Sequence, residues 1–404
     1  MDKDQVERYW FWGSPLLCFG EHSLDFLQDI PGKKAFIVTD DFIKKNLLPN
    51  VTKKLKKFDK DYEVFSEVMP DPKEEMVLRG VEACKEYDPD LILGVGGGSS
   101  IDTAKAIWVL YERPDLNLDD IHPFVEMGLG NKAKMVALPT TSGTGAETTW
   151  AVIITRIRED GTEIKLELAN RDVVPNYAIL DPVFTMKMPP NLTAATAFDA
   201  LSHVYEGLIS EFRNDFSEGM GIKSVDLIRN YLPVVYEDGD NVEAREAIHN
   251  AAAMAGLCFG NSQVIMGHGL GHALGAVFHK PHGLCVGVFC PYILQFQLNG
   301  PNKEVVENLL GKTAKMLGIA EWSDENGAAA SKVINDIKTL QEKVDFPKTL
   351  ADLDISKEEF EGKIDQVVEL ALESSSSEFS IRPATAKEYE KILRDAYEGR
   401  DINW

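Results

Sequence analysis

Hydrophobic residues in the first half of the chain alternate between short continuous runs and helical spacing. The continuous runs are rich in Val, Ile and Leu, and they predict β-strands at Ala35–Thr39, Tyr62–Phe65, Leu91–Val95, Met135–Leu138 and Ala178–Leu180. Amphipathic stretches such as Lys73–Glu86, whose apolar residues recur near the period of a helix, lie between these runs. Apolar strands that alternate with helices are typical of a parallel sheet covered on both faces. We therefore predict a Rossmann-like α/β domain at the start of the chain.

A hairpin and the second half of the chain differ from this pattern. Val152–Arg158 and Glu163–Leu168 flank an Asp-Gly pair, which predicts a β-hairpin. Beyond Pro182 strands are hard to find, and the periodicity predicts helices at Asn191–Ser210, Ser217–Tyr231, Val242–Cys258, Glu304–Met316 and Ala328–Lys343. We expect an α/β domain over residues 1–185 and an all-helical domain over residues 186–404.

Size and composition agree with a two-domain protein and exclude several kinds of partner. A chain of 404 residues exceeds what one hydrophobic core usually serves. The net charge of −23 repels nucleic acid and anionic membranes, because both bind proteins through Lys and Arg. The five cysteines form no CxxC pair, and the segment Met1–Ser14 carries acidic residues where a signal peptide needs basic ones. We therefore expect a cytoplasmic protein without disulfide bonds, binding neither nucleic acid nor membrane.

Glycine follows the predicted strand Leu91–Val95 in an unbroken triplet, Gly96-Gly97-Gly98, just before a helical pattern begins. Glycines let a ligand approach the backbone, and the unpaired N–H groups of a helix start favour a pyrophosphate. A tight turn with Ser or Asp as N-cap explains the same residues, and the spacing is not that of the usual GxGxxG motif.

A second turn, Pro139–Glu147, also follows a predicted strand and contains four hydroxyl side chains. Hydroxyl-rich turns can simply cap helices. However, the carboxyl ends of parallel strands lie on one side of a sheet, where open α/β folds bind ligands, so the two loops together favour a cofactor. Asp40, at the end of the first predicted strand, is either a helix N-cap or a ribose-binding carboxylate that favours NAD over NADP.

Four of the eight histidines lie within residues 268–282. His268 and His272 are four residues apart, as are Asp199 and His203, so each pair shares one face of its helix. Nitrogen and oxygen ligands without thiolate suit a divalent transition metal such as Fe²⁺ or Zn²⁺. These residues predict a metal site drawn from two apolar helices. The spacing alone leaves open which histidines bind the metal.

Four segments together resemble the iron-containing (group III) alcohol dehydrogenase family: GGGSSIDTAK at residues 96–105, PTTSGTGAE at 139–147, DALSH at 199–203 and HGLGHALGAVFHKPHG at 268–283. The resemblance implies a metal, Fe²⁺ with Zn²⁺ as an alternative, held by four residues: Asp199, His203, His268 and His282. It also implies that His272 is the catalytic residue that relays a proton near the substrate and the nicotinamide.

The same resemblance assigns the cofactor-binding residues. It places Gly97, Gly98, Ser99 and Asp102 in the pyrophosphate loop, Thr140, Thr141 and Thr144 in the second cofactor loop, and Lys165 and Leu180 at the nicotinamide ribose. Asp40 matches the acidic position of members that use NAD, so NAD is expected ahead of NADP.

Three further positions carry smaller predictions. Glu206, one turn beyond His203, is expected to orient that histidine if it has a role. Gly269 and Gly271 replace alanines common in the family, and we interpret them as extra room beside the metal.

The predicted function is that of a metal-dependent alcohol dehydrogenase or aldehyde reductase, with reversible hydride transfer between a small primary alcohol and NAD. From the family, Trp150 and residues 259–266 are expected to line the substrate pocket, with Asn261 or Gln263 as polar contacts. We expect a homodimer or a higher homo-oligomer. The alternatives are a member resembling dehydroquinate synthase or glycerol dehydrogenase, and a non-catalytic relative that binds metal or nucleotide.

Overall fold

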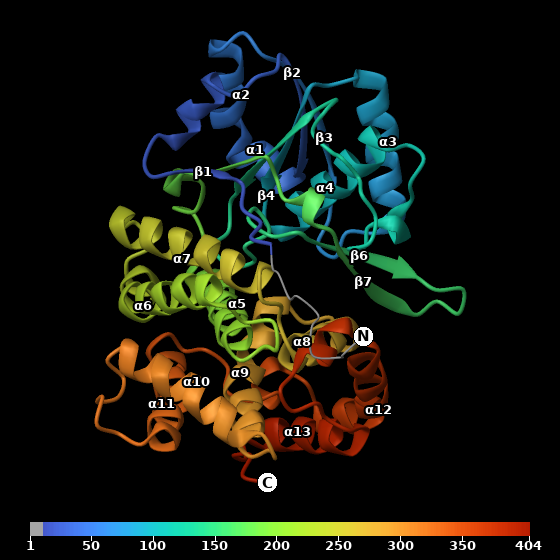
Figure 1. Ribbon diagram of the computed structural model, residues 1–404. Coiled ribbons are helices and arrows are strands. Elements are labelled where there is room, and N and C mark those ends of the chain that lie inside the picture. Colours follow the sequence, from blue (N-terminus) through green and yellow to red (C-terminus); the bar gives the residue numbers. More distant parts are fainter. Residues whose placement is uncertain (1–10) are drawn as a thin grey trace, which may run out of the picture.

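The computed structural model describes residues 11–404, and its first half is built on a parallel β-sheet (Figure 1). Six strands form this sheet in the order β1-β8-β5-β4-β2-β3, and every neighbouring pair is parallel. In chain order the strands are β1 (Leu16–Phe19), β2 (Lys34–Asp40), β3 (Asp61–Val68), β4 (Leu91–Gly96), β5 (Lys134–Pro139) and β8 (Tyr177–Leu180). The predicted α/β architecture is confirmed.

Helices cover both faces of the sheet, which explains why its central strands are apolar throughout. The helices are α1 (Asp41–Asn46), α2 (Leu48–Lys57), α3 (Glu74–Tyr87) and α4 (Gly98–Glu112). Alternate residues of β2 enter different cores: Phe36 packs with residues of α3 and α4, whereas Ile37 packs with residues of α1 and α2. Because both faces are buried, polar residues have no place in the middle of these strands.

One strand of the sheet, β1, is absent from the sequence-based prediction. It has only four residues, lies at the sheet edge and pairs solely with β8 among the described strands. Two of its four side chains, Leu16 and Phe19, are exposed. A short edge strand of this kind lacks the buried run that identifies its neighbours.

The predicted hairpin is confirmed and forms a separate two-stranded antiparallel sheet of β6 (Ala151–Ile157) and β7 (Glu163–Ala169). Its turn places Gly161 at φ 85°, a conformation that glycine adopts without strain. The hairpin extends from the α/β part alongside the helical part, where β7 contacts α8 (Figure 1).

The second half of the chain is helical, as predicted. Its helices are α5 (Pro190–Leu208), α6 (Asp215–Glu237), α7 (Val242–Gly260), α8 (Met266–Phe278), α9 (His282–Leu298), α10 (Lys303–Met316), α11 (Asn326–Lys343), α12 (Lys357–Glu373) and α13 (Ala386–Glu398). Their apolar faces form one continuous core in which α5 and α9 are buried over most of their length.

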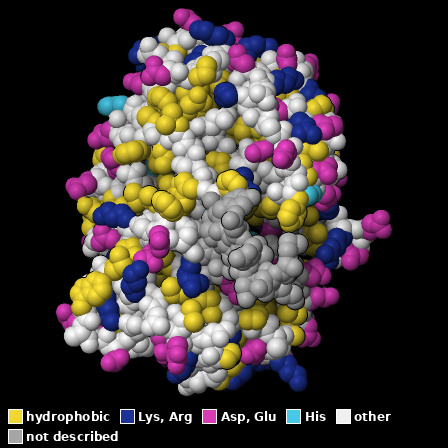
Figure 2. Space-filling view, viewed as in Figure 1, with side chains coloured by type: hydrophobic (Ala, Val, Ile, Leu, Met, Phe, Trp, Pro, Cys, Tyr) yellow, Lys and Arg dark blue, Asp and Glu magenta, His cyan; other side chains and the backbone are white. Residues whose placement is uncertain are grey.

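Within residues 11–404, no helix is long and apolar enough to cross a membrane. The first ten residues, on which the prediction about a signal peptide partly depends, lie outside the described part of the chain. Acidic and basic side chains are interspersed over the face shown in Figure 2.

Candidate metal centre and cofactor loops

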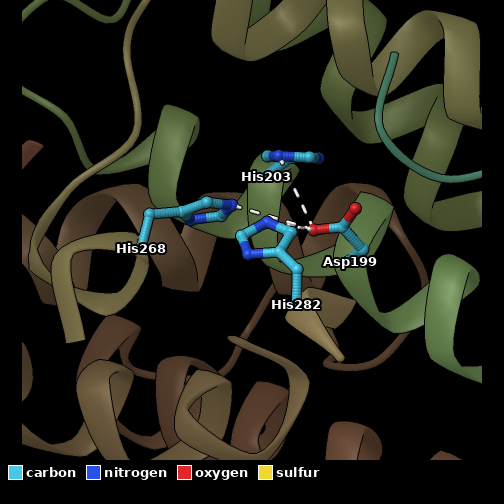
Figure 3. Close-up of side chains that lie close together, drawn as sticks. All are labelled: Asp199, His203, His268 and His282. Atoms are coloured by element: carbon cyan, nitrogen blue, oxygen red, sulfur yellow. Dashed lines mark ion pairs between the residues drawn. The ribbon is translucent and has the colours of Figure 1, made fainter. Parts of the chain in front are cut away.

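Four side chains of the helical part converge on one point (Figure 3). Asp199 and His203 lie one turn apart on α5, His268 lies on α8, and His282 is the first residue of α9. The Asp199 carboxylate oxygen Oδ1 lies 3.7 Å from His203 Nε2, 3.9 Å from His268 Nε2 and 3.3 Å from His282 Nε2. One ligand atom from each of the four residues lies within 4.8 Å of all the others. The site therefore uses three helices, where the sequence predicted two.

The arrangement fits a divalent cation because two of its ligand atoms are buried without a hydrogen-bond partner in the described part of the chain. Asp199 Oδ1 and His268 Nε2 are buried and have no hydrogen-bond partner among the described residues. An unpaired buried carboxylate is costly unless a cation compensates its charge. Although burial opposes ionisation of Asp199, the three histidines hold the pKa of its carboxyl below the ordinary value. Burial lowers the pKa of His203 to about 3, so its imidazole is neutral, as a metal ligand must be.

A buried carboxylate, Glu206, holds the ligand His268 in place. Glu206 Oε1 lies 2.9 Å from His268 Nδ1, while Oε2 accepts hydrogen bonds from the backbone N–H groups of Ile265 (2.7 Å) and His268 (3.2 Å). A Cβ at Gly267 would lie 2.4 Å from Glu206 Oε1, so this approach requires glycine. The expectation that Glu206 orients His203 is wrong: tertiary packing brings it to His268.

The other two glycines of α8 permit close packing. A Cβ at Gly271 would lie 2.3 Å from Val286 Cγ1 of α9, and one at Gly269 would lie 2.7 Å from Ser377 Oγ. Their interpretation as extra room beside the metal is therefore wrong, because neighbouring side chains already fill the space. His203, in turn, is held by Phe259, whose ring is stacked on it with centroids 3.9 Å apart.

His272 lies beside the four-residue cluster, with its ring centroid 5.0 Å from that of His282. Its Nδ1 lies 2.7 Å from Glu167 Oε1, which comes from β7 of the hairpin. Sequence reasoning missed Glu167. The only signal was a charged residue between apolar ones in a strand, which is ordinary for the solvent face of a hairpin. His279, by contrast, ends α8 in a left-handed conformation with φ 53° and is exposed.

The first glycine-rich loop leads from β4 into α4. Gly97 occupies the N-cap position of α4, and among the described residues no side chain caps this helix. Gly97, Gly98 and Ser99 are half-buried, whereas the strand before them is buried throughout. Uncapped N–H groups at a partly open helix start suit a pyrophosphate.

The second loop lies directly against the first. The Thr140 N–H donates to the Gly96 carbonyl at 3.0 Å, and a Cβ at Gly98 would meet Thr144 Cγ2 at 2.9 Å. Thr141 and Thr144 are half-buried, whereas Thr140 is buried. The two predicted loops thus form one surface at the carboxyl ends of β4 and β5, and added side chains on the glycines would fill it. This surface fits a nicotinamide cofactor.

Two acidic residues assigned to the cofactor have structural contacts of their own. Asp40 Oδ1 accepts the Ile43 N–H at 2.9 Å and so caps α1, as its alternative interpretation proposed. Asp102 is buried, and its Oδ2 accepts the Ile153 N–H of the hairpin at 3.1 Å. Burial raises the pKa of Asp102 to about 6. Asp102 therefore connects α4 to the hairpin.

The two residues assigned to the nicotinamide ribose lie in different elements. Lys165, on β7, forms an ion pair with Asp71 and lies 3.1 Å from Thr155 Oγ1. Leu180 is a buried residue at the end of β8, and its carbonyl accepts the Gly20 N–H.

Of the expected substrate contacts, Asn261 has its side chain engaged elsewhere. Its Oδ1 accepts the Gly13 N–H at 2.8 Å, and its Nδ2 donates to the Gly13 and Leu257 carbonyls. Trp150 is half-buried, and Gln263 has a positive φ of 71°.

Nearly the whole chain matches known protein families in sequence. Residues 15–182 match the family described as iron-containing alcohol dehydrogenase, and residues 193–397 match the C-terminal domain of the Fe-containing alcohol dehydrogenase family. The chain is 35% identical to an NADPH-dependent butanol dehydrogenase of Clostridium saccharobutylicum over 96% of this chain and 97% of that protein. It is 31% identical to an NAD-dependent methanol dehydrogenase of Bacillus methanolicus over 92% and 94% of the two chains.

A solved structure shares the fold. The alcohol dehydrogenase from Oenococcus oeni superposes with a TM-score of 0.88 at 27% identity, covering 96% of this chain and all of that one (100%).

Proposed function

The chain belongs to the iron-containing alcohol dehydrogenase family, and from that premise we propose that it interconverts a small primary alcohol and its aldehyde with NAD as the hydride acceptor. As a member of this family it is an alcohol dehydrogenase that uses a divalent metal and a nicotinamide cofactor. The single observation that carries the proposal is the buried Asp199 Oδ1, which has no hydrogen-bond partner within residues 11–404 and is surrounded by three imidazoles.

In the proposed reaction Asp199, His203, His268 and His282 hold the cation. A divalent metal bound there would supply a Lewis acid for the negative charge on the substrate oxygen. The nicotinamide supplies the hydride acceptor. His272 takes up the proton that the alcohol releases, since it lies beside the cluster and is not one of its four members.

The cofactor is held by the surface that the two loops form. We propose that Gly97, Gly98 and Ser99 bind the pyrophosphate through backbone N–H groups, and that Thr140, Thr141 and Thr144 shape the neighbouring wall. Asp102 supports this surface through its contact with Ile153. Lys165 is assigned to the nicotinamide ribose. Lys165 lines the same cavity as His272, which supports this assignment. Leu180 remains assigned to the ribose on family resemblance alone.

NAD is proposed ahead of NADP because of Asp40. Its carboxylate can accept hydrogen bonds from ribose hydroxyls and repels a 2′-phosphate. The family itself does not decide this, because one relative is named NADPH-dependent and another NAD-dependent. Iron is proposed for the metal, with zinc as the alternative, since the same nitrogen and oxygen ligands accept both.

The cellular location is proposed from the state of the cysteines. The five cysteines are all free, and four of them are buried, which suits a reducing compartment and supports a cytoplasmic location. We keep the homodimer or larger homo-oligomer as a prediction, to be tested by the mass of the protein in solution.

The test is turnover by the metal-loaded protein. Mixing it with NAD and a panel of short primary alcohols is expected to produce NADH absorbance, and His268→Ala is expected to lose both bound metal and turnover. Absence of NADH across the panel from wild-type protein with confirmed metal content would contradict the proposal and favour a non-catalytic relative. Full activity of His268→Ala would show that the ligand assignment is wrong.

A further inference from the structure

The carboxylate of Glu167 has three hydrogen-bond partners from two other parts of the chain. Its Oε1 lies 2.7 Å from His272 Nδ1 on α8 and accepts the Ser374 hydroxyl at 2.8 Å, while Oε2 accepts the Ser375 hydroxyl at 2.6 Å. The side chains of Glu167 and His272 are each only 15% exposed. A carboxylate in such surroundings holds its partners in one geometry.

The protonation of this pair follows from its contacts. Both oxygens of the Glu167 carboxyl accept a hydroxyl hydrogen bond, Oε1 from Ser374 and Oε2 from Ser375, and such bonds favour the ionised carboxylate. An ionised carboxylate has no hydrogen to donate, so the short contact requires a proton on His272 Nδ1. In a neutral imidazole the other nitrogen, Nε2, then carries the free lone pair.

We propose that Glu167 is a positioning residue for the alcohol dehydrogenase reaction: it fixes His272 in the Nδ1–H tautomer and so keeps Nε2 ready to accept the proton of the alcohol. The inference rests on the proposed function, which gives that proton to His272. As the O–H bond of the alcohol breaks, Nε2 binds the proton, and the charge of Glu167 stabilises the imidazolium that forms. In aldehyde reduction the same proton returns to the oxygen.

A purely structural role for Glu167 is the competing explanation, because this residue also connects the hairpin to the segment after α12. The structure contains a control for that role. Arg158, at the end of the same hairpin, forms an ion pair of 2.9 Å with Glu373 at the end of α12. Arg158→Ala removes a connection between the same two regions and leaves the contact between Glu167 and His272 unchanged.

The kinetic test compares Glu167→Ala, Glu167→Gln and Arg158→Ala with wild type, each loaded with metal. Glu167→Ala is expected to lower kcat by roughly 10- to 100-fold with KM little changed, below the 10²- to 10⁴-fold that a general base contributes. Glu167→Gln is expected to lose less of its kcat, because the amide oxygen can still accept a hydrogen bond from the Nδ1–H group. Arg158→Ala is expected to retain kcat. Unchanged kcat in Glu167→Ala, or an equal loss in Arg158→Ala, would overturn the proposal.

A second measurement needs no turnover. The imidazole ¹⁵N signals of the zinc-loaded protein report the tautomer of each histidine, and His272→Ala identifies those of His272. Wild type is expected to show the Nδ1–H tautomer, and Glu167→Ala a mixture of the two. An Nε2–H tautomer in wild type would overturn the inference even if Glu167→Ala did not fold. If wild type oxidised no alcohol but showed the Nδ1–H tautomer, the proposed function would fail while the positioning by Glu167 stood.

Discussion

Asp40 shows how one side chain can serve the fold and the cofactor together. Its Oδ1 accepts the Ile43 N–H and caps α1, while its Oδ2 lies 3.7 Å from the position that a Cβ of Gly96 would occupy. The carboxylate thus faces the start of the first glycine-rich loop. The two interpretations that the sequence left open are therefore compatible.

Substitution of Asp40 tests the preference for NAD over NADP. Asp40→Gly is expected to raise kcat/KM for NADP relative to NAD, since the negative charge that repels the 2′-phosphate is removed. Glycine replaces a good N-cap residue at a cost of only a few tenths of a kcal/mol, so the protein should remain folded. Steady-state kinetics with both cofactors measures the ratio.

Asp40→Asn is the matched control, because an amide oxygen can still cap α1 while the charge is absent. Both variants should shift the ratio in the same direction. If neither variant changed it, Asp40 would have no part in cofactor choice.

Two carboxylates, Glu206 and Glu167, position histidines of the site. Each holds one histidine of the site through Nδ1, at 2.9 Å for His268 and 2.7 Å for His272. Because Nδ1 is engaged in each contact, the other ring nitrogen, Nε2, remains available to bind the metal in His268 or a proton in His272. Both carboxylates come from elements remote in sequence from the histidine that they hold.

At the scale of elements, the start of α4 is packed closely against the second cofactor loop. Two neighbouring glycines are in contact with the second loop, and a Cβ at Gly98 would lie 2.9 Å from Thr144 Cγ2. Such a contact requires one loop to move. The loops belong to different strands, so their relative position depends on the register of β4 with β5.

Gly98→Ala is expected to weaken cofactor binding about 10-fold, since overpacking of this kind costs roughly 1–3 kcal/mol. Metal content should be unchanged, because the metal site lies in the helical part. Titration of NADH fluorescence measures the affinity.

Gly362→Ala provides the comparison for that substitution, because this glycine of α12 has open space around it and its alanine variant should bind NADH as wild type does. Equal affinity of Gly98→Ala and wild type would contradict the assignment of this loop to the cofactor.

At the scale of the whole molecule, the metal site joins α5, α8 and α9 within the core of the helical part. Asp199, His203 and His268 are buried there, and the sheet is not involved. A cation bound to these helices stabilises the folded state, because the unfolded chain offers no such site.

Metal removal is therefore expected to lower the Tm. At a free metal concentration of about 100 Kd, binding adds roughly 2.7 kcal/mol to the free energy of unfolding, and its loss corresponds to several degrees. Calorimetry of chelator-treated and reloaded protein measures the difference. His268→Ala should melt at the same temperature with and without metal, and an unchanged Tm in wild type would contradict a site built into this core.

Much of this protein was predictable from local pattern. Five strands of the sheet, the hairpin and five helices of the second half (α5, α6, α7, α10 and α11) followed from periodicity, because a buried strand or a helix face repeats along the chain itself. The pairs Asp199 with His203 and His268 with His272 followed for the same reason, since residues four apart share a helix face.

Tertiary structure decided the rest. Spacing could not choose between His272 and His282 as the third histidine beside Asp199, because that depends on how α9 begins against α5. It could not reveal β1, whose only described partner strand is β8, more than 150 residues away. Glu206 and Glu167 reach their histidines across 62 and 105 residues of chain. Contacts at such separations are set by packing of whole elements, which leaves no periodic signal in the sequence.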